Sequence, residues 1–233
     1  MILFRLSEDS LISLEHFFIY LQFFSIFDEN KPIHRGENMK IIGINGSPRK
    51  DSNTRILLEK ALAIASIDQI STEIIDVYIT LKELKNPFCI HCSSPCNKSC
   101  YKGTKLEEDF KKISEADALI LASPVYFGSV SAQLKAFWDK TRALRTDHKL
   151  VGKIGAAISV GASVFGGQET TIRTLHDMMF IQGMTLVGDG LINVNAGHQG
   201  ACCVNPVLEN ENLLKNVENI GKRVAMEVIT RNS

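Results

Sequence analysis

Four cysteines lie close together in one polar run of the chain, and this run carries its clearest chemical signal. Their spacing is Cys-x2-Cys-x3-Cys-x3-Cys, within a segment expected to be a loop, residues 86–104 (the cysteine loop). Thiolates this close suit a [4Fe–4S] cube, whose iron corners take successive ligands, whereas one zinc ion usually takes two separated pairs. The spacing predicts a cluster; zinc or another metal, and a metal-free loop, are the alternatives. The predicted ligands are Cys89, Cys92, Cys96 and Cys100.

A second chemical signal is a stretch of small and hydroxylated residues, residues 46–54 (the phosphate loop), between an apolar strand and a helix. Its side chains and the free N–H groups of a helix start suit a phosphate monoester dianion. It lacks the glycine spacing of a dinucleotide fingerprint and the lysine of a nucleotide triphosphate loop. An ordinary helix cap is the alternative interpretation. The predicted phosphate contacts are Ser47, Arg49, Ser52, Asn53 and Thr54.

Two further loops follow apolar strands and could hold a flat ring system. Residues 124–128 (the aromatic loop) place an aromatic pair between proline and glycine, which offers a flat surface and free backbone groups, although the pair could instead belong to the core. Residues 161–167 (the glycine loop) let the backbone approach a ligand edge closely. The predicted contacts are Pro124, Val125, Tyr126, Phe127, Gly128, Ser159, Gly161, Gly166 and Gly167.

Strands alternating with helices position these loops. The periodicity predicts strands over residues 41–44, 71–79, 116–122, 154–160 and 185–194. It predicts helices over residues 54–67, 105–115, 130–144, 168–182 and 208–230. This alternation indicates an α/β fold, a flavodoxin-like doubly wound five-stranded parallel sheet of order 2-1-3-4-5 with helices on both faces. Ligands in such sheets bind beyond the carboxyl ends of the strands, so the three loops should form one site.

Together the three loops resemble those of the NAD(P)H-dependent FMN reductase family, from Met39 to about residue 195. A cysteine-rich loop at this position resembles the iron–sulfur flavoprotein branch, whose first three cysteines are spaced more tightly, as C-x2-C-x2-C. The resemblance implies non-covalent FMN, with its phosphate on the phosphate loop and its isoalloxazine between the aromatic and glycine loops. It also implies a homodimer or homotetramer.

A flavin beside an iron–sulfur cluster connects two-electron with one-electron chemistry. The leading hypothesis is therefore an FMN-dependent electron-transfer protein that passes electrons between FMN and a [4Fe–4S] cluster, with ferredoxin, NAD(P)H or a quinone as its small redox partner. No side chain is assigned as a catalytic acid or base. The alternatives are an NAD(P)H-dependent FMN or quinone reductase without a cluster, and a non-enzymatic flavodoxin-like carrier or redox sensor.

Composition limits the class of partner and the compartment. Lys and Arg together number 26, as do Asp and Glu, so the net charge of zero gives no electrostatic case for nucleic acid or an anionic membrane. The crowding of four of the six cysteines argues against a disulfide framework and indicates a reducing cytoplasm. Cys202 and Cys203 are expected to be small, partly buried residues that point in different directions, and His91 a spacer.

Residues 1–38 differ in composition from the FMN-binding domain expected over residues 39–233, and hold six of the 12 phenylalanines. The apolar run 11–27 is 17 residues long and includes polar residues, so it is short for a membrane span. A signal peptide fits poorly because no small-residue cleavage site follows. Residues 1–38 are expected to be an N-terminal extension, either an appended amphipathic helix or a segment that is not translated. The Arg35-Gly36-Glu37 codons can resemble a ribosome-binding site, which favours an over-extended gene start with Met39 as the native start.

Overall fold

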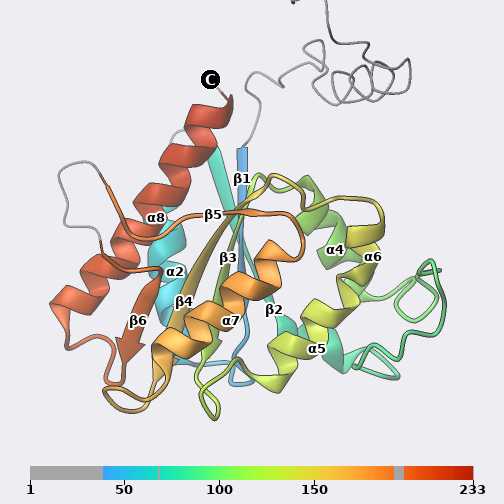
Figure 1. Cartoon of the computed structure of the whole chain (residues 1–233), viewed down its shortest axis with the longest axis horizontal. Helices are drawn as coiled ribbons and strands as arrows, with labels where there is room; N and C mark the ends of the chain where they lie inside the picture. Colours follow the sequence, from blue (N-terminus) through green and yellow to red (C-terminus); the bar gives the residue numbers. More distant parts are fainter. Residues whose placement is uncertain (1–38, 68, 192–196, 233) are drawn as a thin grey trace, which may run out of the picture. The chain divides into compact units, whose positions relative to one another are not determined.

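A computed structural model describes residues 39–67, 69–191 and 197–232. The expectations for residues 1–38 lie outside this range. The described chain forms a parallel sheet in which β2, β1, β3, β4 and β5 are neighbours in that order, and β6 also pairs with β4 (Figure 1). The strands are β1 (Met39–Asn45), β2 (Ile70–Asp76), β3 (Ala118–Pro124), β4 (Ile154–Gly161), β5 (Thr185–Leu186) and β6 (Ala201–Val204).

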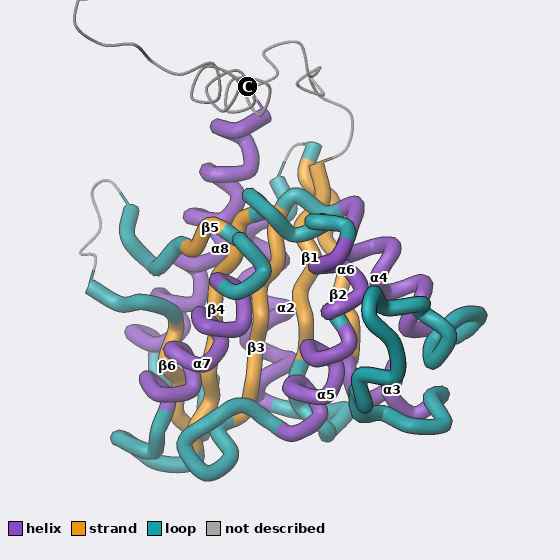
Figure 2. The backbone as a smooth tube through the Cα atoms, turned by 45° about the vertical axis from the view of Figure 1, so that its right-hand side comes forward, coloured by secondary structure: helices purple, strands orange, loops and turns teal. Residues whose placement is uncertain are grey.

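Helices cover both faces of the sheet, as Figure 2 shows. One face carries α2 (Asn53–Ala65) and α8 (Glu211–Asn232), which pack against each other. The other carries α3 (Val77–Lys82), α4 (Lys105–Glu115), α5 (Ala132–Lys140), α6 (Arg142–Thr146) and α7 (Gln168–Phe180). None of the helices in the described ranges is both long and apolar enough to cross a membrane.

Burial on both faces explains the continuous apolar strands. In β1, Ile41 packs into the core beneath α2 and α8, and its neighbour Ile42 packs into the core on the opposite face; both are fully buried. Successive residues of a strand point to opposite faces, so a strand covered on both sides needs apolar residues throughout. The predicted flavodoxin-like fold and strand order are confirmed.

The largest differences from the predicted boundaries concern the second strand, the helix over residues 130–144 and the fifth strand. The second strand ends at Asp76, because Val77, Thr80 and Leu81 are buried at helical spacing in α3. The helix expected over residues 130–144 is divided into α5 and α6. The fifth strand, expected over residues 185–194, is only two residues long, and residues 192–196 lie outside the described ranges.

The fifth position of the sheet is shared by two short strands. β5 pairs with the start of β4, and β6 pairs with its end, from Ile158 opposite Ala201 to Gly161 opposite Val204. Between them the chain leaves the sheet at Gly188, and the buried Asp189 accepts hydrogen bonds from the backbone and ring nitrogens of His198, at 3.1 and 2.7 Å. These hydrogen bonds join the beginning and the end of the segment between β5 and β6, and the chain then pairs with β4 again as β6.

Candidate functional site

The structure brings the phosphate, aromatic and glycine loops together at the carboxyl ends of β1, β3 and β4. The N–H of Gly46 donates to Ala122 O at the end of β3 (2.8 Å), and Val125 N donates to Val160 O at the end of β4 (2.8 Å). The buried Ser131 hydroxyl donates to Gly46 O at 2.5 Å. Because these bonds join backbones at neighbouring strand ends, the relative placement of the three loops depends on the sheet itself.

The phosphate loop is shaped by its own polar side chains. Asn45 Oδ1 accepts from Ser47 N at 3.1 Å, and Ser47 Oγ accepts from Arg49 N at 3.2 Å. Both side chains lie in buried positions, so these bonds hold the turn from beneath. The Arg49 side chain is exposed and makes no ion pair within the described part of the chain.

The start of α2 presents unpaired backbone donors. Ser52 caps the helix, since its Oγ accepts from Arg55 N at 3.2 Å. The N–H groups of Asn53 and Thr54 have no acceptor among the residues that the structure describes. Free N–H groups at a helix N-terminus, together with the positive end of the helix dipole, favour an anion. Helix capping and anion binding are therefore compatible, because the Ser52 side chain accepts from Arg55 N and leaves the N–H groups of Asn53 and Thr54 for an anion.

The two arginines at this corner of the described structure differ in whether a carboxylate already pairs with them. Asp76, at the end of β2, accepts from Asn45 Nδ2 at 2.7 Å and pairs with the Arg55 guanidinium. The hydrogen bond that Arg55 donates to Asp76 raises the pKa of Arg55, which also pairs with Glu59. Arg55 is thus committed to carboxylates, whereas Arg49 is not. The two free N–H groups and Arg49 fit the phosphate group of FMN.

The aromatic loop presents its rings to the surface. Tyr126 and Ser129 exchange two backbone hydrogen bonds, of 2.9 and 3.2 Å, around a tight turn. Phe127 and Gly128 at its tip have positive φ angles of 51° and 74°. Tyr126 is 37% exposed and Phe127 fully exposed, so the alternative that this pair belongs to the core is wrong. An exposed aromatic turn remains available to a flat ring.

A threonine that the sequence analysis did not identify joins the aromatic and glycine loops. Thr170 Oγ1 lies 2.8 Å from the carbonyl oxygens of both Gly128 and Gly167. Gly167 has φ 97°, and a Cβ placed there would lie 2.9 Å from Gly128 Cα. The close approach of two backbones therefore requires glycine at this position.

Replacing Gly167 by alanine is expected to lower the free energy of unfolding by about 1–3 kcal/mol, through a left-handed backbone angle and a clash with Gly128. Gly103→Ala is the matched control, because Gly103 also has a positive φ, of 75°, but its Cβ would meet nothing within 4 Å. Urea denaturation of both variants measures the difference. Equal destabilisation would show that the contact between the loops contributes nothing.

Ser159, one of the predicted contacts, does not reach the surface of the site. Ser159 is fully buried, and its hydroxyl donates to Gln168 O at 3.0 Å, so it supports the start of α7 from below. Its Oγ also lies 3.7 Å from Cys202 Sγ. As predicted, Cys202 and Cys203 point in different directions, since Cys202 packs against the core on the α4–α5 face and Cys203 lies in the core beneath α2 and α8. Cys202 is partly buried as expected, whereas Cys203 is fully buried. Burial raises the pKa of both thiols, that of Cys203 to about 12.

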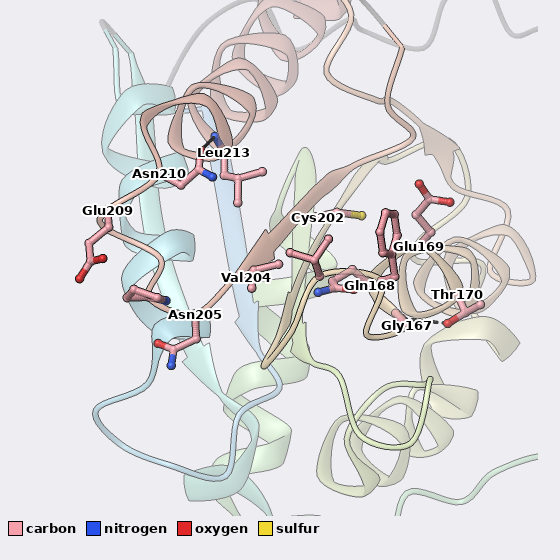
Figure 3. A pocket seen from close by; sticks show the side chains of 13 residues that line it. Gly167, Gln168, Glu169, Thr170, Cys202, Val204, Asn205, Glu209, Asn210 and Leu213 are labelled. Atoms are coloured by element: carbon pink, nitrogen blue, oxygen red, sulfur yellow. Dashed lines mark hydrogen bonds between the residues drawn. The ribbon is translucent and has the colours of Figure 1, made fainter.

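A groove of about 870 Å³ lies beside the glycine loop, between the start of α7 and the segment that joins β6 to α8 (Figure 3). Cys202 and Val204 line it from β6, and Glu169 and Glu209 are its charged residues. Of the predicted FMN contacts, Gly167 also lines this groove. Because its described lining has acidic and apolar groups but neither lysine nor arginine, this groove does not suit the FMN phosphate.

The cysteine loop joins α3 to α4 and extends beside α5 and α6 (Figure 1). Its four thiols are free, with Cys89 and Cys96 partly buried and Cys92 and Cys100 exposed. Among the described residues, no three His, Cys, Asp or Glu side chains are gathered as ligands around one point. The donor set, four thiols on one loop, matches the chemistry of an iron–sulfur cluster.

The second half of the cysteine loop is anchored to the domain. Tyr101 is buried with its ring edge-on to Phe110, at 5.2 Å between centroids, and burial raises the pKa of its hydroxyl. Lys140 Nζ, from the end of α5, donates to Phe88 O at 3.3 Å and to Cys100 Sγ at 3.7 Å.

The loop tip is held by α6 and the residue that follows it. Arg142 Nη2 lies 2.9 Å from His91 Nε2, and Lys98 pairs with Asp147 at 2.9 Å. His91 is exposed and contacts an arginine in this structure, and its role as a spacer stays a prediction.

The comparison with known families identifies the family to which the chain belongs. The family model of NADPH-dependent FMN reductase matches residues 39–199. The chain belongs to this family. An iron–sulfur flavoprotein of Methanocaldococcus jannaschii is 43% identical over 190 residues, 80% of this chain and 96% of that protein. An iron–sulfur flavoprotein of Methanosarcina thermophila is 37% identical over 198 residues, 83% of this chain and 98% of that protein.

The solved structures agree with the fold. A flavodoxin, WrbA-like protein from Agrobacterium tumefaciens superposes with a TM-score of 0.57 at 18% identity, covering 84% of this chain and 99% of that one. The resemblance inferred from the three loops is confirmed, and the chain is a flavin oxidoreductase of an FMN reductase family. The individual cofactor contacts stay predictions.

Proposed function

We propose that this protein is an iron–sulfur flavoprotein that transfers electrons between FMN on the three loops and a [4Fe–4S] cluster on the cysteine loop. The similarity over almost the full length of two relatives named iron–sulfur flavoproteins supports this assignment. Bound FMN would exchange a hydride or single electrons, and a cluster single electrons.

The observation that carries the proposal is that one helix contacts both sites. α5 is nine residues long, which is about 14 Å. Its N-cap, Ser131, accepts from Leu134 N and donates to Gly46 O in the phosphate loop. Its last residue, Lys140, reaches Phe88 O and Cys100 Sγ in the cysteine loop. The cysteine loop is thereby attached, at Phe88 and Cys100, to the helix that begins at the proposed flavin site.

The residues of the chain would bind and orient the two groups. The N–H groups of Asn53 and Thr54, with the Arg49 guanidinium, would hold the FMN phosphate. The aromatic and glycine loops would hold the isoalloxazine, with Thr170 keeping the two loops together. Cys89, Cys92, Cys96 and Cys100 would bind the cluster. No described acid or base is needed for electron transfer itself.

We also propose the setting in which the protein acts. A reducing cytoplasm would preserve four free thiols. The proposed partners are ferredoxin, NAD(P)H or a quinone, and the exposed Tyr126 and Phe127 leave a face of the site that a homodimer or homotetramer could cover.

The deciding experiment is anaerobic purification followed by measurement of FMN, iron and acid-labile sulfide. We expect about one FMN and four each of iron and sulfide per chain. FMN without iron or sulfide would contradict the cluster and favour an NAD(P)H-dependent FMN or quinone reductase. Reduction assays with NADH, NADPH and reduced ferredoxin then identify the donor. Failure of every donor and acceptor pair to turn over would favour a carrier.

A further inference from the structure

Lys140 is a buried cation that pairs with no carboxylate in the described ranges of the chain. Only 3% of the surface of this residue is exposed. Its two recorded contacts are a carbonyl oxygen, Phe88 O at 3.3 Å, and a sulfur, Cys100 Sγ at 3.7 Å. Among the described residues no carboxylate pairs with it, since the neighbouring Asp139 pairs with Lys135. A buried ammonium is costly unless an anion compensates it.

The cysteine loop can supply that anion. Of the two acceptors that Lys140 contacts, the Cys100 sulfur is the one that can carry a negative charge, because a cysteine that binds a metal does so as a thiolate. Tyr101, the next residue, is held in the core, so Cys100 cannot easily move away from α5. The reduction potential of an iron–sulfur cluster depends on nearby charge and on hydrogen bonds to its sulfur ligands. Lys140 supplies both at one ligand.

We infer that Lys140 is the counter-cation of the cysteine loop and raises the reduction potential of the cluster held there. This inference rests on the proposed function. Reduction adds a negative charge to the cluster, and a fixed positive charge beside one ligand stabilises the reduced form more than the oxidised form. Lys140 is thus a residue that tunes the electron-transfer reaction and takes no part in bond making.

Lys140→Gln tests the charge, because glutamine removes it but keeps an N–H donor for Phe88 O. We expect the equilibrium constant for cluster reduction to fall at least tenfold, a shift of 59 mV to more negative potential for a one-electron couple. Lys140→Arg retains the charge and should keep the wild-type potential. Lys135→Gln is the matched control on the same helix, since Lys135 is exposed and paired with Asp139. Potentiometric titration followed by electron paramagnetic resonance gives each midpoint.

The outcomes separate this inference from the proposed function. Wild-type protein without iron and sulfide would overturn both. A wild-type cluster with an unchanged potential in Lys140→Gln would overturn the inference alone, as would an equal shift in Lys135→Gln. If Lys140→Gln fails to retain a cluster, retention by Lys140→Arg supports the counter-cation, and loss from both variants shows a packing role and overturns it.

Discussion

Cys96→Ala is expected to reduce bound iron and sulfide to below about a tenth of the wild-type content while FMN remains bound, because a [4Fe–4S] cluster needs a ligand at each iron corner. Cys96 is the informative choice, since it is partly buried and packs against the core on the α4–α5 face. Alanine is preferred to serine because a serine oxygen could still act as a ligand. Colorimetric iron and sulfide analysis and the flavin absorbance measure the three contents.

Cys202→Ala provides the control for this prediction. Cys202 is also a partly exposed free thiol, but it lies in β6 beside the groove and outside the cysteine loop. Its replacement should leave iron, sulfide and FMN unchanged. A full cluster content in Cys96→Ala would contradict the assignment of ligands. Zinc without sulfide in the wild-type protein, lost in Cys96→Ala, would establish the zinc alternative.

The parts of the fold that could be predicted are those in which local pattern and tertiary environment agree. Residues 118–122 of β3 are all buried, so their continuous apolar run was a sufficient signal. The six residues of α3 are too few for helical spacing to be distinguished from a strand, and β2 was therefore extended through Ile79. β6 has four residues and returns to the sheet after a long excursion, so its pairing depends on contacts distant in sequence.

The residues of the site likewise include some with a local sequence signal and some without one. The phosphate loop was recognisable because its small and polar residues lie between a strand and a helix that are adjacent in sequence. Asn205, directly after β6, accepts a 2.7 Å hydrogen bond from the Asn53 side chain at the start of α2. This contact joins residues 152 positions apart, so no local pattern predicts it. Lys140 did have a local signal: it follows the buried Ala136 and Phe137 by four and three positions, which places it on the apolar side of α5.

Asn53→Pro is expected to weaken FMN binding about 10- to 100-fold relative to Asn53→Ala, because a lost hydrogen bond to a charged group corresponds to about 1.5–3 kcal/mol. Both variants remove the side chain and its 2.7 Å bond to Asn205, so their difference isolates the backbone N–H at the first helical position. Titration of the flavin-free protein with FMN, followed by flavin fluorescence, gives both dissociation constants.

The helix should tolerate this proline. Ser52 has φ −125° and ψ 147°, an extended conformation that suits the residue before proline. The first position of a helix is where proline is favoured, because its missing N–H has no partner within the helix. Since the Asn53 N–H has no acceptor in the described part of the chain, equal urea midpoints are expected for the two variants. Equal FMN affinities would then show that this N–H does not contact the phosphate, and binding would depend on Arg49 and Thr54 instead.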